Sequence, residues 1–249
     1  MLKEERHQII LNEVRVHNRI LLTDIANLLD VSADTIRRDI KSLDNQKKLK
    51  KVHGGAVSLG FNNYNPTIED IYALSEKKMI AKKAIQLLKD GQVILLTGGT
   101  TNIEIAKLIP ARLKLTCFTP SLQVAIQMLN KPDIETVFIG GKLSNNSQIT
   151  IGGNAINMLS QIKTDICFLG TNSISCIDGL SEFDWDIVQV KRAMIRTSSK
   201  VVSPSISEKL DSTQRYKICE IEAIDILITE LEPSNSLLKP YADRGLSIL

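Results

Sequence analysis

The stretch 31–43 constrains this chain more than any other part of the sequence, because it predicts a helix with two unlike faces. Ser32 is a good N-cap, since its hydroxyl can accept a hydrogen bond from a backbone N–H of the first turn. Ile36, Ile40 and Leu43 follow at spacings of four and three, which places them on one side of a helix. An apolar stripe of this kind requires a partner, so we expect this helix to cover the core of a folded domain.

The other side of the predicted helix is polar and mostly basic. Asp34 in its first turn suits the positive end of the helix dipole. Arg37, Arg38 and Lys41 continue the same face. The DNA major groove admits a helix, and arginine can bridge O6 and N7 of guanine. The pattern therefore suits DNA recognition, although a solvated surface helix can carry the same charges.

The segments before this helix favour DNA binding. Helical patterns occupy residues 3–16 and 23–29, with a short apolar run at 20–22 between them. We expect Thr23 to cap the second of these helices and Leu28 to be one of its buried residues. A helix, a short turn and a basic helix form the helix-turn-helix arrangement, in which the basic helix enters the groove.

A lysine-rich segment after the basic helix predicts a small hairpin, or wing. Gly54 and Gly55 permit a tight turn there. Lysines on such a wing, Lys47 included, would contact phosphates, which position a protein without conveying sequence information. The residues expected to contact DNA from the helix and the wing are Ser32, Asp34, Thr35, Arg37, Arg38, Lys41, Lys48, Lys50, Lys51, His53 and Gly54.

The distribution of charge supports this assignment. The chain has 249 residues and a net charge of +3 from 31 Lys/Arg and 28 Asp/Glu. Residues 1–57 hold 11 of the basic and 8 of the acidic residues, so the whole excess lies in this segment. A basic first segment on a neutral remainder is typical of a nucleic-acid-binding end attached to another domain.

The first segment also resembles a known family. The pattern that carries the resemblance is Val31-Ser32, then Thr35-Ile36-Arg37-Arg38-Asp39, then Leu43, followed by His53-Gly54-Gly55-Ala56. It is similar to the N-terminal signature of the DeoR-type bacterial repressors of sugar metabolism. One departure is Lys48, where that family usually has a glycine before the wing.

The remainder of the chain predicts an α/β domain with a mostly parallel sheet. We expect a linker at 58–75 between a winged helix-turn-helix domain at 1–57 and an effector-sensing and oligomerisation domain at 76–249. The latter opens with a helix at 76–90 that turns Met79 inward. Beyond it, short apolar runs alternate with helical patterns, which is typical of a parallel sheet with helices between its strands. The expected strands are 93–96, 115–118, 136–139, 166–169 and 224–228, and the expected helices are 103–109, 122–129 and 155–162.

Turns at the ends of three of these strands predict an anion site. Glycines let a ligand approach the backbone, and the start of a helix offers unpaired N–H groups. The first turn, at residues 97–101, is not a Walker A loop, because no Gly-Lys-Ser/Thr follows it. The third turn adds the cation Lys142. The candidate ligand residues in the three turns are Gly98, Gly99, Thr100, Thr101, Thr119, Ser121, Gly140, Gly141 and Lys142.

These turns also resemble the DeoR-type effector domain, together with the segments Phe168-Leu169-Gly170 and Val190-Lys191-Arg192-Ala193-Met194. The resemblance implies a Rossmann-like domain similar in fold to ribose-5-phosphate isomerase, which binds phosphorylated sugars or related metabolites as inducers. It adds Lys191 and Lys209 to the expected ligand residues, and Asn172 can hydrogen-bond a sugar. The chain departs from that pattern at Pro120, Ile187 and Ser205.

We therefore expect a DNA-binding transcriptional regulator, a repressor of carbohydrate-metabolism genes that a phosphorylated metabolite releases from double-stranded operator DNA. One subunit contacts one half-site, so a homodimer or homotetramer is expected. One alternative is a regulator whose altered pocket binds no effector. Another is a sugar-phosphate isomerase, but the segment 170–173 lacks the acidic residues that those enzymes carry.

The sequence predicts no metal, cofactor or membrane segment. Its four cysteines show no CxxC spacing, and no histidine lies near any of them. No apolar run approaches the length that spans a bilayer, and no signal peptide is evident. We therefore expect a cytoplasmic protein. The lack of acidic residues at 170–173 is the reason to expect that it is not an enzyme.

Overall fold

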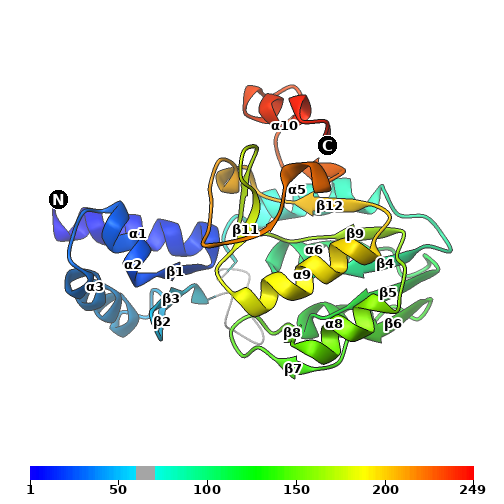
Figure 1. Cartoon of the computed structure of the whole chain (residues 1–249), viewed down its shortest axis with the longest axis horizontal. Coiled ribbons are helices and arrows are strands. Elements are labelled where there is room, and N and C mark those ends of the chain that lie inside the picture. The colour runs from blue at the N-terminus through cyan, green and yellow to red at the C-terminus, as the bar shows by residue number, and fades with distance from the viewer. Residues whose placement is uncertain (60–70) are drawn as a thin grey trace. The chain divides into compact units, whose positions relative to one another are not determined.

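The computed structural model describes residues 1–59 and 71–249, which form two compact units, Met1–Tyr72 and Ala73–Leu249 (Figure 1). Most of the expected linker at 58–75 lies outside the described residues, so that boundary stays a prediction. No helix within the described ranges combines the length and apolarity that a membrane crossing needs.

The first unit is a winged helix-turn-helix fold. Its sheet is antiparallel with strand order β1-β3-β2. Ile36, Ile40 and Leu43 lie at the centre of its core, as the apolar stripe predicts. The elements of the unit are α1 (Lys3–His17), β1 (Arg19–Leu21), α2 (Leu22–Leu28), α3 (Ala33–Asn45), β2 (Lys50–Val52) and β3 (Gly55–Val57).

Two expectations for α2 are wrong. The helix begins directly after β1 with Leu21 as its N-cap, so Thr23 lies inside it and donates its hydroxyl to Asp24 Oδ1 at 3.0 Å. Leu28 is 60% exposed, because the buried face of α2 runs through Ile25 and Ala26 on the opposite side. The sequence pattern alone did not show that β1 ends at Leu21. The place where β1 ends sets where α2 begins and therefore which face of α2 turns inward.

The end of α3 is closed by a left-handed residue. The N–H of Lys47 donates to Asp44 O at 2.9 Å and the N–H of Lys48 to Leu43 O at 3.0 Å, which is the Schellman pattern. Lys47 has φ of 56°, a conformation that favours glycine. The turn therefore places its glycine-type position at Lys47, and the departure seen at Lys48 does not disturb it.

Lys47→Gly is expected to stabilise the first unit by about 0.5–1 kcal/mol, because relief of the left-handed lysine exceeds the extra entropy of glycine in the unfolded chain. Native-state hydrogen exchange of the α3 amides in the full chain measures the change. Lys48→Gly removes the same charge without relieving any left-handed residue, and it should destabilise instead. Equal effects of the two substitutions would contradict this account.

The second unit is built on a seven-stranded parallel sheet of order β15-β14-β12-β9-β4-β5-β6. This confirms the α/β class. The strands are β4 (Val93–Leu96), β5 (Leu115–Thr119), β6 (Ile134–Phe138), β9 (Ile166–Phe168), β12 (Val201–Pro204), β14 (Ile226–Ile228) and β15 (Ser247–Ile248). The longer helices are α5 (Leu74–Ile85), α6 (Thr100–Leu108), α7 (Leu122–Met128), α8 (Gly153–Ser160) and α9 (Trp185–Thr197).

The sheet has its topological switch point at β4. From there the chain builds β5 and β6 on one side and β9, β12, β14 and β15 on the other. Helix α6 packs between α5 and α7, and α8 packs against α9 on the near side of the sheet in Figure 1. Ligands of such sheets bind outside the carboxyl ends of the strands at the switch point, which here are the ends of β4, β5 and β9.

Smaller elements surround this sheet. A three-stranded antiparallel sheet has the order β10-β11-β13, and a two-stranded hairpin pairs β7 with β8. A short helix, α10, follows near the C-terminus. The bounds are β7 (Lys142–Leu143), β8 (Thr150–Ile151), β10 (Ser173–Ser175), β11 (Gly179–Glu182), β13 (Tyr216–Cys219) and α10 (Lys239–Asp243), with the 3-10 turns Ser207–Lys209, Ile221–Ala223 and Ser236–Leu238.

Two expectations for α5 are wrong. The helix ends at Ile85, before the expected end at residue 90, because the chain turns from Gln86 onward. Met79 is 47% exposed, whereas Lys77, Ile80, Ala81 and Ala84 are buried. These four residues share one face of the helix, and Met79 lies off it. The helix therefore turns Lys77 inward, while Met79, which was expected to face the core, lies at the surface.

Candidate functional site

The exposed face of α3 carries the residues that the sequence assigned to base contact. Ser32 caps the helix, since its Oγ accepts a hydrogen bond from Thr35 N at 3.2 Å. Asp34, Arg37, Arg38 and Lys41 are all exposed. Arg37 pairs with Asp34 one turn earlier. Arg38 makes no ion pair within the part of the chain that the structure describes, so its guanidinium is available.

The same helix is anchored through Asp39 on its buried side. The Asp39 carboxylate accepts hydrogen bonds from Arg6 Nε at 2.5 Å and from His7 Nε2 at 3.1 Å, both on α1. Burial raises the pKa of Asp39, but the hydrogen bonds from Arg6 and His7 outweigh it and hold the pKa below the usual value. A carboxyl with a lowered pKa stabilises the fold at neutral pH, and the contribution is lost as the pH falls through the acid range.

The wing stands beside α3 and is tied to it. Lys51 N donates to Asp44 Oδ1 at 3.0 Å, and Leu22 N donates to Gly54 O at 2.8 Å. Lys48, Lys50, Lys51 and His53 are exposed. The second contact joins the turn of the wing to the start of α2, and the first joins strand β2 of the wing to the end of α3. The basic groups of α3 and the wing are therefore held in a fixed arrangement.

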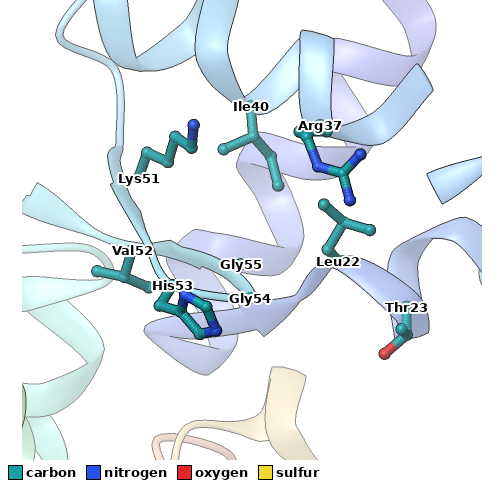
Figure 2. A pocket seen from close by; sticks show the side chains of 9 residues that line it. All are labelled: Leu22, Thr23, Arg37, Ile40, Lys51, Val52, His53, Gly54 and Gly55. Carbon is teal, nitrogen blue, oxygen red and sulfur yellow. The ribbon is translucent and has the colours of Figure 1, made fainter. Parts of the chain in front are cut away.

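A hollow of about 430 Å³ lies between α2, α3 and the wing (Figure 2). Figure 2 shows Arg37 from α3 and Lys51 from the wing on either side of Ile40, with His53 at the turn of the wing. Its lining is Leu22, Thr23, Arg37, Ile40, Lys51, Val52, His53, Gly54 and Gly55. A concave surface bordered by cations from two elements suits a phosphate backbone.

In the second unit, the turn after β4 is tightly packed. A Cβ on Gly98 would lie 2.9 Å from the Ile149 side chain, so a larger residue there would have to displace that side chain. Thr97 Oγ1 accepts from Gly170 N at 2.8 Å and from Asn102 Nδ2 at 2.7 Å. These bonds lock the turns that follow β4 and β9 together at the switch point.

The first predicted ligand turn contains Gly98, Gly99, Thr100 and Thr101, and it leads into α6 at Thr100. Gly99 has φ of 102°, and both threonines are almost completely buried. The location fits the prediction that a ligand meets backbone N–H groups and hydroxyls at a helix start. A ligand role for these four residues stays a prediction.

The second predicted turn uses its hydroxyl groups internally. Thr119 Oγ1 donates to Leu96 O at 2.8 Å and accepts from Ser121 N at 3.0 Å, while Ser121 Oγ caps α7 by accepting from Val124 N at 3.4 Å. Pro120 O accepts from Thr150 N at 2.8 Å. These bonds fix the turn beside β4, and a ligand role for Thr119 and Ser121 remains a prediction.

The third predicted turn lies farther out. Gly140, Gly141 and Lys142 are exposed, and β6 is the edge strand of the sheet. The Lys142 ammonium makes no hydrogen bond within the described residues. The three turns therefore do follow neighbouring strands, as expected, but Lys142 is not among the buried cations.

The second unit buries the lysines Lys77, Lys191 and Lys209, which are 3%, 6% and 7% exposed. Lys191 Nζ donates to Glu182 Oε2 at 2.6 Å, and Lys209 Nζ donates to Thr171 O at 2.9 Å. Burial, together with the neighbouring ammonium groups of Lys77 and Lys191, lowers the pKa of Lys209 to about 7. Burial likewise lowers the pKa of Lys77 to about 8.

Asn172 is part of the same cluster, because its side-chain amide donates to Glu182 Oε1. The cluster joins helix α5, the turn after β9, strand β11, helix α9 and the segment after β12. A buried group of lysines at the carboxyl ends of central strands can bind an anion strongly, since water there does not screen the charges.

Comparison with known proteins agrees with this division into two units. A model of the DeoR-like helix-turn-helix domain matches residues 6–60, and a model of the DeoR C terminal sensor domain matches residues 73–231. The chain belongs to the DeoR family. As a member of it, the chain is a transcriptional regulator with a DNA-binding domain and a sensor domain.

Relatives of this chain match along almost their whole length. The HTH-type transcriptional regulator GolR of Listeria innocua is 32% identical over 98% of this chain and 97% of the relative. The HTH-type transcriptional repressor GlcR of Bacillus subtilis is 32% identical over 100% and 96%. Among solved structures, ribose 5-phosphate isomerase A from Methanocaldococcus jannaschii is 20% identical over 54% of this chain and 53% of that chain, with a TM-score of 0.39.

Two charged residues near the expected ligand site of this sensor domain, Lys77 and Glu182, were not predicted from the sequence. Lys77 carried a usable signal, because it lies three and four residues before Ile80 and Ala81 on the buried face of its helix. Glu182 carried none, since its partners Asn172 and Lys191 become neighbours only when β11 packs beside α9. Both belong to the lysine cluster that the expected Lys191 and Lys209 also occupy.

Proposed function

We propose that this chain represses carbohydrate-metabolism genes by binding operator DNA with α3 and the wing, and that a phosphorylated sugar or related metabolite releases it. The observation that supports the sensor role is the buried cluster of Lys77, Lys191 and Lys209 at the switch point of the sheet. A metabolite phosphate offers the charge that these lysines match. A further relative, 27% identical over 100% of this chain, is named as the glycerol-3-phosphate regulon repressor of Escherichia coli.

The DNA-binding part of the proposal rests on the hollow beside α3. Arg37 and Lys51 border it, and Arg38 and Lys41 extend the basic face of the helix. One winged helix-turn-helix domain contacts one half-site of the operator, so we propose a homodimer or homotetramer. The effector acts through its different affinities for the DNA-bound and free arrangements. On this proposal the chain is not an enzyme.

This function can be tested in vitro even though the operator sequence is unknown. A binding sequence is first selected from a random pool of duplex DNA with the full-length protein. Fluorescence anisotropy then measures the affinity for that sequence in the presence of sugar phosphates and of the matching free sugars. Release by a phosphate and not by its free sugar supports the proposal. Failure to select any DNA sequence would overturn the repressor function.

A regulator that binds DNA without any effector is the second candidate. The observation that favours it is the Glu182 carboxylate, which already pairs with Lys191 inside the expected ligand site. Under this alternative the protein selects a DNA sequence, but no metabolite changes its affinity. The same anisotropy experiment therefore separates the two functions.

Thr100→Ala is expected to weaken the response to the releasing phosphate by about tenfold to 150-fold, because a lost hydrogen bond to a charged group costs about 1.5–3 kcal/mol. The affinity for DNA should stay unchanged, since Thr100 lies in the sensor domain. The concentration of phosphate that releases half of the bound DNA measures the effect. Thr213→Ala, at an exposed position of the same domain, is the control and should behave as the wild type. An unchanged response of the Thr100 variant would remove this turn from the site.

A further inference from the structure

The Glu182 carboxylate is held from three directions inside the sensor domain. Lys191 Nζ donates to its Oε2 at 2.6 Å, while the Asn172 amide and Phe183 N, at 2.9 Å, donate to its Oε1. The side chains of Glu182 and Lys191 are 5% and 7% exposed. Both oxygens therefore have partners in the absence of a ligand, and the carboxylate has a fixed position.

Lys191 depends on β11 for this partner. Ile187, one turn earlier on α9, is apolar and buried, so that position offers no carboxylate to Lys191. Glu182 at the end of β11 supplies it instead. The positive charge of Lys191 is thus balanced before any effector arrives.

Lys209 differs from Lys191 in its balance of charge. Its Nζ donates to a backbone carbonyl, that of Thr171, at 2.9 Å. The charged groups that act on it are the ammonium groups of Lys77 and Lys191 and the carboxylate of Glu182. Attraction for an anion is therefore concentrated at Lys209, whereas the end of the site formed by Asn172, Glu182 and Lys191 is neutral as a whole.

We propose that Glu182 determines the specificity of this site: its carboxylate reserves the Asn172–Lys191 end for a hydroxyl group of the effector and rejects a second anionic group there. A hydroxyl can donate to a carboxylate and accept from an ammonium or an amide. A second phosphate or a carboxylate would meet the buried negative charge of Glu182 at close range, where screening is weak. The effector class is therefore a monophosphorylated polyol or sugar, in preference to a bisphosphate or a phosphorylated acid. This inference rests on the proposed function of the sensor domain.

Removal of the negative charge tests it with inorganic pyrophosphate as the probe, a compact anion with two phosphoryl groups. Isothermal titration calorimetry on the full chain compares the wild type with Glu182→Gln. The neutral variant should bind pyrophosphate at least tenfold more tightly, because Lys191 is no longer balanced by a carboxylate. Adding Lys191→Met to that variant should abolish the gain. Glu220→Gln, which removes an exposed carboxylate that pairs with Lys217, makes the same change in net charge and should bind as the wild type does.

Equal affinities of the wild type and the Glu182→Gln protein, including no measurable binding by either, would overturn the inference. Glu182→Thr is a second neutral variant with a smaller polar side chain, and circular dichroism checks that both variants fold. If neither folds, Glu182 serves the fold rather than specificity, which also overturns the inference. A gain in pyrophosphate affinity without any release of DNA by sugar phosphates would leave the role of Glu182 intact and refute the proposed function instead.

Discussion

Arg38→Ala is expected to abolish sequence-specific DNA binding while the protein remains folded. Arg38 is exposed on α3 and makes no ion pair within the described residues, whereas its neighbour Arg37 is paired with Asp34. A bidentate contact between arginine and guanine contributes about 1–3 kcal/mol of discrimination. In the proposed dimer both half-sites lose it, so the affinity for the selected operator should fall by about 30-fold to 10⁴-fold.

Fluorescence anisotropy with the selected operator and with a scrambled duplex measures this loss. The affinity for the scrambled duplex should fall far less, because phosphate contacts from the wing remain. Arg15→Ala removes the same charge from an exposed position on α1 and is the matched control. Operator affinity that survives the Arg38 substitution would refute the assignment of α3 as the recognition helix.

Gly55→Ala is expected to have the largest effect on stability, and Gly54→Ala a much smaller one. A Cβ on Gly55 would lie 1.9 Å from Ile20 O, a backbone atom of the paired strand β1. Because β3 is the central strand of its sheet, any shift of Gly55 disturbs its pairing with β1 or with β2. The cost should reach about 3 kcal/mol or more. Gly54 has φ of 75° with open space around it, so alanine there costs only about 1–2 kcal/mol of backbone strain.

Hydrogen exchange of the β1 and β3 amides in the full chain measures both changes. The order of the two effects is informative, since conformational preference alone ranks the left-handed Gly54 as the more sensitive position. The Gly55 variant should also lose affinity for scrambled DNA, because the wing can no longer hold Lys50 and Lys51 beside α3. Equal protection factors in the two alanine variants would contradict the packing argument.

The sequence determined the elements whose signals are local. The cap at Ser32 and the stripe of Ile36, Ile40 and Leu43 predicted α3, because a helix repeats within four residues. The apolar run at 93–96 matched β4 at both ends, and the alternation of runs and helices predicted the parallel sheet. The turns after β4, β5 and β6 were correctly expected to follow neighbouring strands.

The tertiary structure decided which charged groups are buried and what faces them. The exposure of Leu28 and Met79 does not follow from their apolar character, since the docking of each helix selects its inward face. The short strand β11 was not expected, yet its end places Glu182 against Lys191 on α9. A buried ion pair between distant segments leaves no periodic trace in a sequence, because only the packed fold brings its two charges together and excludes the water that would otherwise screen them.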